Sequence, residues 1–248
     1  MQIIAVISGK GGVGKTTFTA NIGAALAGMG QKVLVIDGNL SGANLGLHLG
    51  LSNFYPFSLN NVLRGEVSLN HAIYKHPLGF DIIPASLTDI EVNPRRLKYV
   101  LADLVEKKDF VIIDAAAGID NEVRASIEAA DKVIIVTNPE VPAVVDALRA
   151  KTLAEKNSRT VLGVVLNKAK GDKFELDEKE IEEIMEMPVI ANIPYSNRVR
   201  ESIALKQPVV THSPYNSATL EIRKLSHMLL GQEPPAYGFF TRLRGRFS

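Results

Sequence analysis

The stretch Gly9-Lys10-Gly11-Gly12-Val13-Gly14-Lys15-Thr16 follows a short apolar run and opens a segment with helical periodicity. It matches the P-loop pattern G-x-x-x-x-G-K-[ST] in the order of strand, loop and helix that the pattern requires. Its four glycines let the backbone curl around a phosphate chain, so that successive N–H groups and the positive end of the following helix face the anion. We therefore predict a nucleotide-phosphate site here rather than an ordinary glycine-rich turn.

The P-loop pattern gives its two last residues separate roles. Lys15 is expected to reach the β- and γ-phosphates, and the Thr16 hydroxyl is expected to hold Mg²⁺. The predicted phosphate contacts are Gly9, Lys10, Gly11, Gly12, Val13, Gly14, Lys15, Thr16 and Thr17.

Short β-branched runs alternate with amphipathic segments, which is typical of a parallel sheet covered by helices on both faces. The predicted strands are Ile3 to Ser8, Lys32 to Asp37, Phe80 to Pro84, Phe110 to Asp114, Lys132 to Thr137, Thr160 to Asn167 and Val189 to Pro194. The predicted helices are Thr16 to Met29, Pro94 to Lys107, Asn121 to Ala129, Pro142 to Glu155, Asp177 to Glu186, Ser196 to Lys206 and Leu220 to Leu230. This order predicts a single α/β domain of the P-loop NTPase type, with a mostly parallel twisted sheet of about seven or eight strands.

The Pro234-Pro235 pair breaks the chain after the last predicted helix. We therefore predict a nucleotide-binding domain at residues 1–231, a proline-rich linker at 232–236 and a separate tail at 237–248.

The composition excludes several classes of function. With 28 Lys and Arg against 27 Asp and Glu the net charge is +1, so nothing global draws the protein to nucleic acid. The absence of cysteine excludes disulfides, thiolate nucleophiles and Cys-held metal clusters. No apolar run approaches the roughly 18 residues of a membrane span, and no basic leader precedes the apolar N-terminal run. We expect a cytoplasmic protein.

Further motifs follow the P-loop in a fixed order. Lys10 gives the loop a second lysine, in the form K-G-G-V-G-K-T, and the later motifs are Asp37 to Gly46, Val111 to Gly118, Thr137 to Glu140, Val165 to Lys168 and Ile193-Pro194. Together they resemble the signatures of the MinD/ParA family of deviant Walker A ATPases, including its switch I, Walker B strand and switch II. The resemblance covers most of the chain and implies an ATPase that uses ATP and Mg²⁺.

In this family the additional lysine, here Lys10, is understood to reach across a dimer to the partner's nucleotide, so that ATP holds a sandwich homodimer together. A compact ammonium on a flexible stem suits that role. Asp114 ends an apolar strand and is expected to hold Mg²⁺, partly through water, because a buried carboxylate is costly unless it is paired or binds a metal. Asp37 is expected to contribute to the same Mg²⁺ site.

The resemblance also predicts contacts away from the P-loop. Gly118 is expected to offer its backbone N–H near the γ-phosphate, as switch II loops do. Asn167 is expected to read the adenine edge with its amide, and Pro194 to pack on the base.

Position 39 departs from the family pattern. Family members usually carry an Asp where this chain has Asn39, and that Asp is associated with positioning the attacking water. An amide can orient water but cannot accept a proton as a carboxylate does. We therefore expect intact binding with slow or impaired hydrolysis, from either a naturally slow ATPase or a variant that traps ATP in the dimer. The predicted catalytic residues are Lys10, Lys15, Asp37, Asn39 and Asp114.

The tail has the pattern of an interfacial helix. At about 100° per residue, its apolar side chains fall within one arc of roughly 100°, with arginines along the edge. The apolar residues are Phe239, Phe240, Leu243 and Phe247, and the arginines are Arg242, Arg244 and Arg246. This pattern predicts binding to an anionic membrane surface and resembles the membrane-targeting sequence of MinD-type members. A tail that packs back on the domain is the alternative.

These observations favour a MinD-like ATPase whose ATP-dependent dimer attaches to the inner face of the cell membrane. There it would position an unidentified protein partner, at the division site or elsewhere. A ParA-like DNA-partition ATPase is one alternative, but we expect no nucleic-acid partner because the sequence has no basic stripe outside the tail. A MinD-related regulator of flagellum or archaellum number is a second alternative. An iron–sulfur carrier of the same superfamily would need cysteine ligands.

Overall fold

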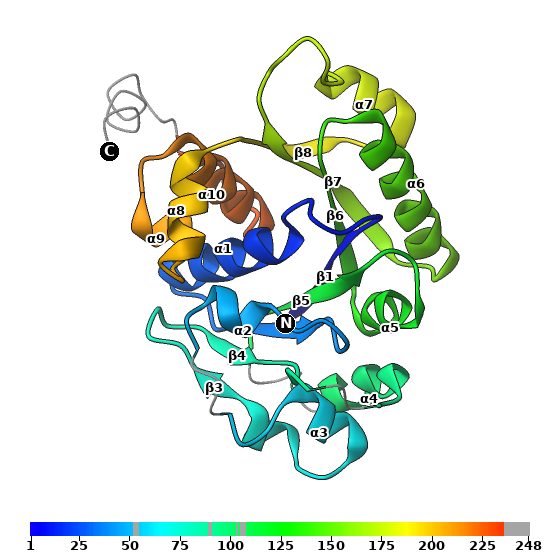
Figure 1. The fold of residues 1–248 in the computed structure, drawn as a ribbon, viewed down its shortest axis with the longest axis vertical. Coiled ribbons are helices and arrows are strands. Elements are labelled where there is room, and N and C mark those ends of the chain that lie inside the picture. Colours follow the sequence, from blue (N-terminus) through cyan, green and yellow to red (C-terminus); the bar gives the residue numbers. More distant parts are fainter. Residues whose placement is uncertain (52–54, 89–90, 103, 105–107, 236–248) are drawn as a thin grey trace.

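The computed structural model describes residues 1–51, 55–88, 91–102, 104 and 108–235. These residues form three layers, with one twisted sheet between two layers of helices (Figure 1). None of the helices in the described ranges is both long enough and apolar enough to cross a bilayer. The predicted membrane-binding residues, all within 237–248, lie outside the described part of the chain.

The sheet has eight strands in the order β3-β4-β2-β5-β1-β6-β7-β8. They are β1 (Gln2–Ser8), β2 (Val33–Gly38), β3 (Tyr74–Lys75), β4 (Asp81–Ile83), β5 (Phe110–Ala117), β6 (Lys132–Thr137), β7 (Thr160–Ala169) and β8 (Val189–Pro194). Every neighbouring pair is parallel except β3 with β4. The predicted α/β fold with a mostly parallel sheet is confirmed. The edge strand β3 has two residues, too few to show a periodic pattern.

Two helical layers enclose this sheet. The α-helices are α1 (Lys15–Gly28), α2 (Leu45–His48), α3 (Leu59–Arg64), α4 (Leu97–Ala102), α5 (Asn121–Ala129), α6 (Val141–Lys156), α7 (Glu178–Met185), α8 (Asn197–Ala204), α9 (Val209–His212) and α10 (Ser217–Leu229), with 3-10 turns at η1 (Leu69–Ala72) and η2 (Pro94–Arg96). The predicted helix from Pro94 begins as η2 and continues as α4 to Ala102, and most of its remainder lies outside the described residues. Short helices α2, α3 and α9 were not expected from the sequence.

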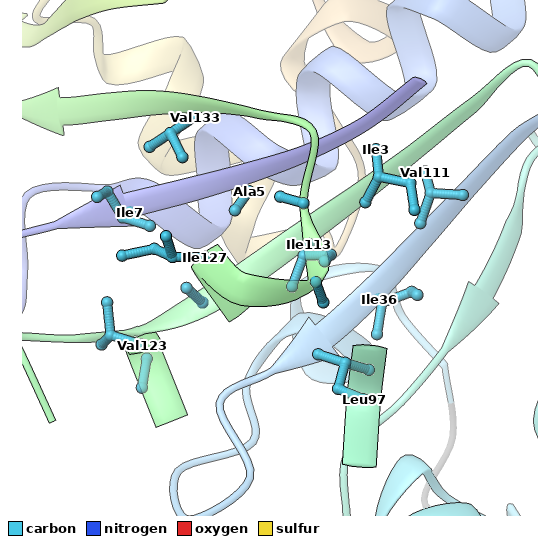
Figure 2. Packing of buried hydrophobic residues seen from close by; sticks show 14 of the residues in the cluster. Ile3, Ala5, Ile7, Ile36, Leu97, Val111, Ile113, Val123, Ile127 and Val133 are labelled. Atoms are coloured by element: carbon cyan, nitrogen blue, oxygen red, sulfur yellow. The ribbon is translucent and has the colours of Figure 1, made fainter. Parts of the chain in front are cut away.

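The central strands bury side chains on both faces, which explains their continuous apolar runs. Along β1, Ile3, Ala5 and Ile7 share a cluster with Val123 and Ile127 of α5. Figure 2 shows Ile3 beside its register partner Val111. The alternate residues of β1 pack on the opposite face against α1 and α10. If a strand shifted by one residue along its neighbour, each of its side chains would move to the opposite face of the sheet. The different helices on the two faces therefore determine the register of the strands.

His76 ties the turn after β3 to the end of α2. Its ring stacks on Phe80 with centroids 4.4 Å apart, and its Nε2 lies 3.0 Å from the Leu49 carbonyl oxygen. The Leu78 N–H donates to Nδ1 at 3.2 Å. The contact with Leu49 requires a proton on Nε2 and the contact with Leu78 an unprotonated Nδ1, so together they require a neutral ring. Burial lowers the pKa of His76 below its ordinary value.

We expect His76 to make stability depend on pH. Below about pH 6.5 the unfolded chain protonates this residue while the folded chain resists, so the free energy of unfolding falls by at most about 1.4 kcal/mol per pH unit. This pH dependence is absent in His76→Gln. The difference in free energy of unfolding between the wild type and this variant, measured by urea titration, should therefore be smaller at pH 5.5 than at pH 7.5. The matched control is His71→Gln at an exposed site. A wild-type advantage over His76→Gln that is constant with pH would contradict this expectation.

Candidate nucleotide-binding site

The site lies where β1, β2 and β5 end at their carboxyl edge. Asp37 on β2 and Asp114 on β5 are direct register partners, and each residue is 1% exposed. Parallel pairing of adjacent strands therefore places two buried carboxylates side by side. Such a pair is stable only with compensating hydrogen bonds or positive charge.

The P-loop leaves β1 and curls over this edge into α1. Gly12 and Gly14 have φ angles of 80° and 95°, a left-handed conformation that side chains disfavour. Gly9 lies so close to α6 that a Cβ atom would stand 2.0 Å from the Asp146 carbonyl oxygen. No side chain caps the first turn of α1, so its N–H groups are free to bind an anion.

Lys15 supplies the positive charge beneath the loop. Its Nζ lies 3.1 Å from Asp114 Oδ1, with side-chain exposures of 8% and 1%. Thr19 Oγ1 donates to the same oxygen at 3.3 Å. Asp114 Oδ2 is buried and has no hydrogen-bond partner among the described residues. One carboxylate oxygen is thus engaged, and the other is available to a cation or to a water bound by it.

Asp37 organises the segment that follows β2. Its carboxylate accepts backbone N–H bonds from Asn39 at 3.2 Å, and from Asn44 and Leu45 at 3.0 Å each. Burial, with the charge of Asp114, raises the pKa of Asp37 to about 7 against the opposing effect of these bonds. Asp37 therefore holds the rest of the switch I motif (Asp37 to Gly46) against the end of the sheet.

Two side-chain contacts shape switch I further. Asn39 Nδ2 donates to the Gly42 carbonyl at 2.6 Å, which closes a turn within the segment. Glu122, in the first turn of α5, accepts the Leu40 N–H at 2.9 Å. Switch I is therefore connected directly to α5, the helix that follows β5.

The P-loop lines a cavity of about 660 Å³. The predicted residues that line it are Lys10, Gly11, Gly12, Val13, Gly14, Lys15, Thr16, Thr17, Asn39, Asn167 and Pro194. Gly9, Asp37, Asp114 and Gly118 are not in this lining. The Gly118 N–H donates to the Ser8 carbonyl at 3.0 Å in this structure. Its contact with the γ-phosphate stays a prediction.

Asn167 fixes the far wall of the cavity. Its Nδ2 donates to the Val13 carbonyl at 2.8 Å, and the Asn138 amide donates to the Asn167 backbone carbonyl at 2.8 Å. Because an amide nitrogen must face the Val13 carbonyl, the orientation of the Asn167 side chain is determined, and its Oδ1 is the atom left to accept a hydrogen bond.

Lys10 lies at the rim of the cavity. Its Nζ is 3.7 Å from Glu140 Oε2, and the two side chains are 35% and 62% exposed. A long ion pair that is this exposed contributes little to stability. The Lys10 ammonium is therefore easily released from Glu140.

The structure adds residues that the sequence did not predict for the site. The additional lining residues include Asn44, His48, Lys168, Tyr195 and Arg200. His48 was not among the predicted site residues, yet its Nε2 lies 3.4 Å from Thr17 Oγ1. Asn44 and Lys168 belong to quoted motifs, but only the folded chain brings them to the cavity.

We expect Lys15 to contribute more to the stability of the nucleotide-free protein than Asp114. Lys15→Met leaves two adjacent buried carboxylates without a cation and should lower the free energy of unfolding by about 3–5 kcal/mol. Asp114→Asn also removes the repulsion with Asp37, so its cost should be smaller, about 1–3 kcal/mol. Urea unfolding with a chelator and no nucleotide measures both.

The matched control is Lys10→Met in the same loop, which should change stability by less than about 1 kcal/mol because its ion pair is exposed. An Asp114→Asn variant less stable than Lys15→Met would show that repulsion between the carboxylates is unimportant.

Comparison with known proteins agrees with this geometry. Residues 4–209 match the family described as the CobQ/CobB/MinD/ParA nucleotide binding domain. The septum site-determining protein MinD of Thermotoga maritima is 37% identical over 210 residues, which cover 80% of this chain and 77% of that protein.

Two solved structures extend the comparison. MinD of Pyrococcus horikoshii in complex with Mg-ADP is 33% identical, with a TM-score of 0.88 over 92% of this chain and 95% of that one. The MinC:MinD complex of Aquifex aeolicus contains a chain that is 31% identical, with a TM-score of 0.87 over 96% of this chain and 99% of that one. This chain therefore belongs to the CobQ/CobB/MinD/ParA family of nucleotide-binding domains and is a MinD-like member of it.

Proposed function

We propose that this chain is an ATPase whose ATP-bound homodimer binds the inner face of the cell membrane through its tail and positions a protein partner there. The observation that carries the proposal is the P-loop cavity with the partly exposed Lys10 at its rim. The cavity accounts for binding within one chain, and Lys10 provides a charge that can reach a second chain.

The site fits a nucleotide with a divalent cation. Among the described residues no three His, Asp or Glu side chains gather to hold a metal by themselves. A cation here would therefore take phosphate oxygens of the nucleotide as further ligands. The buried, unpaired Asp114 Oδ2 supports such a role, with the Thr16 hydroxyl and Asp37 as the other expected contacts. When bound, Mg²⁺ would neutralise phosphate charge. The P. horikoshii MinD structure with Mg-ADP supports this assignment.

The orientation of Asn167 favours adenine over guanine. With Nδ2 engaged by the Val13 carbonyl, Oδ1 can accept from the 6-amino group of adenine but would repel the 6-oxo group of guanine. Pro194, which also lines the cavity, offers an apolar surface to the base. The proposed nucleotide is therefore ATP.

The position of Lys10 supports the proposed homodimer. Releasing it from Glu140 costs little, because the pair is exposed and 3.7 Å long. A triphosphate arriving from a second copy would attract the freed ammonium more strongly than one carboxylate does. We infer that ATP joins the two copies and that its hydrolysis separates them. In the A. aeolicus complex MinD binds MinC, and by analogy the ATP-bound dimer here would present a surface to a protein partner.

The membrane part of the proposal rests on the tail. If its four apolar side chains enter the membrane interface, they contribute roughly 6–12 kcal/mol to the free energy of binding. The three arginines add about 1 kcal/mol each at an anionic surface. Ordering about ten residues costs roughly 10–20 kcal/mol, partly offset by helix formation. One tail therefore binds marginally, whereas two tails in a dimer gain about 10²–10⁴ in avidity.

We expect ATP, but not ADP, to double the molar mass in light scattering and to bring the protein down with anionic vesicles. Lys10→Ala should abolish both effects. Deleting residues 236–248 should abolish sedimentation but leave the ATP-dependent dimer. Vesicles of neutral lipid are the control for the arginine contribution.

Each of these measurements tests a different part of the proposal. A monomer at saturating Mg-ATP would exclude the dimer, and sedimentation of the tail-deleted protein would exclude the tail as anchor. Salt-sensitive retention of the tail-deleted protein on DNA would favour the ParA-like alternative.

We expect Asn39→Asp to raise steady-state ATP turnover at least several-fold. Asn39 now donates to the Gly42 carbonyl, and a carboxylate cannot make that bond, so it would turn toward the cavity and could accept a proton from water. Phosphate release at saturating ATP measures the change. The control is Asn44→Asp, which also lines the cavity and donates to Gly42. An unchanged rate in Asn39→Asp would contradict this account of the residue.

A further inference from the structure

Lys168 occupies a strained position at the end of β7. Its φ angle is 61°, in the left-handed region that residues with side chains rarely adopt. The pairing of β7 with β8 shifts register between Asn167, which faces Ile193, and Ala169, which faces Pro194. Lys168 is therefore the additional residue of a β-bulge. Bulges next to functional sites commonly redirect a side chain.

The bulge directs Lys168 over the P-loop. Its Nζ donates to the Gly12 carbonyl at 2.6 Å, and the preceding Asn167 donates to the Val13 carbonyl at 2.8 Å. The contact is close, because a Cβ on Gly14 would stand 2.2 Å from Asn167 Nδ2 and 3.7 Å from Lys168 Cε. Two consecutive residues of β7 thus hold two consecutive carbonyls of the loop.

This contact determines the direction of the backbone donors. In a trans peptide the C=O and the following N–H point in opposite directions. Holding the Gly12 and Val13 carbonyls toward β7 therefore turns the N–H groups of Val13 and Gly14 away from it. A loop whose N–H groups are already oriented loses less conformational freedom when an anion binds.

Lys168 differs from the two P-loop lysines in its ion pairing. Lys10 pairs with Glu140, and Lys15 pairs with Asp114. Among the described residues Lys168 forms no ion pair, although it lines the cavity. Its ammonium has N–H donors beyond the one used by Gly12.

We infer that Lys168 is a positioning residue for nucleotide binding. Its ammonium, delivered by the bulge, holds the Gly12 carbonyl so that the P-loop N–H groups are oriented for a phosphate before nucleotide arrives. The inference deepens the proposed function and rests on nucleotide binding in this cavity.

A purely structural role makes a different prediction. If the left-handed turn alone mattered, glycine would serve at least as well, because it adopts positive φ without strain. Lys168→Gly keeps the turn and removes the ammonium. Lys168→Met removes the charge and keeps most of the apolar stem, and Lys168→Arg retains a cationic donor.

The test measures binding of a fluorescent ADP derivative with Mg²⁺, together with the thermal midpoint without nucleotide. ADP is used so that dimer formation does not contribute. We expect affinity about tenfold weaker in Lys168→Met and Lys168→Gly, as for loss of a charge-assisted hydrogen bond, and within about threefold of wild type in Lys168→Arg. Lys168→Gly should melt no lower than wild type.

The matched control is Lys170→Met, an exposed lysine of the same segment whose Nζ lies 5.9 Å from the centre of the Tyr195 ring; it should bind ADP as the wild type does. Wild-type affinity in Lys168→Met and Lys168→Gly would overturn the inference and leave the proposed function standing. Loss of affinity matched by a lower thermal midpoint in Lys168→Gly would also overturn it. A wild-type protein that binds no nucleotide would remove the proposed function itself.

Discussion

The contact of Lys15 with Asp114 is the interaction on which the site depends. The sheet register places Asp114 beside Asp37, and both carboxylates are buried. Without a cation between the loop and the strand, this pair would repel in a region of low dielectric. Lys15 supplies that cation from the first residue of α1. The same ion pair therefore secures the P-loop to the sheet and leaves one Asp114 oxygen unused.

The P-loop is held from the opposite side as well. β7 contributes side chains to its carbonyls, α6 blocks any side chain at Gly9, and the glycines supply left-handed backbone. These contacts come from segments more than 130 residues away in the sequence. A loop with few side chains of its own is thus given one conformation by its neighbours. That conformation exposes N–H groups, which is what phosphate recognition requires.

The sequence predicted the fold well because its signals are local. Continuous β-branched runs mark strands buried on both faces, and the P-loop combines glycine spacing with a lysine and a hydroxyl. The contact of His48 with Thr17 and the β-bulge at Lys168 depend on tertiary packing. The periodicity of the sequence therefore does not predict them. The hydrogen bond from the Gly118 N–H to the Ser8 carbonyl was not predicted from the sequence either. The role of Asp37 in closing switch I likewise became evident only from its three N–H bonds.

The bond between Glu122 and the Leu40 N–H has a mechanical consequence. Glu122 stands in the first turn of α5, whose buried side chains Val123 and Ile127 pack in the same cluster as Leu97 of α4. A displacement of switch I would pull on the end of α5 and tilt it against α4. The layer of α4 and α5 is thus connected to switch I through one hydrogen bond and a shared apolar cluster.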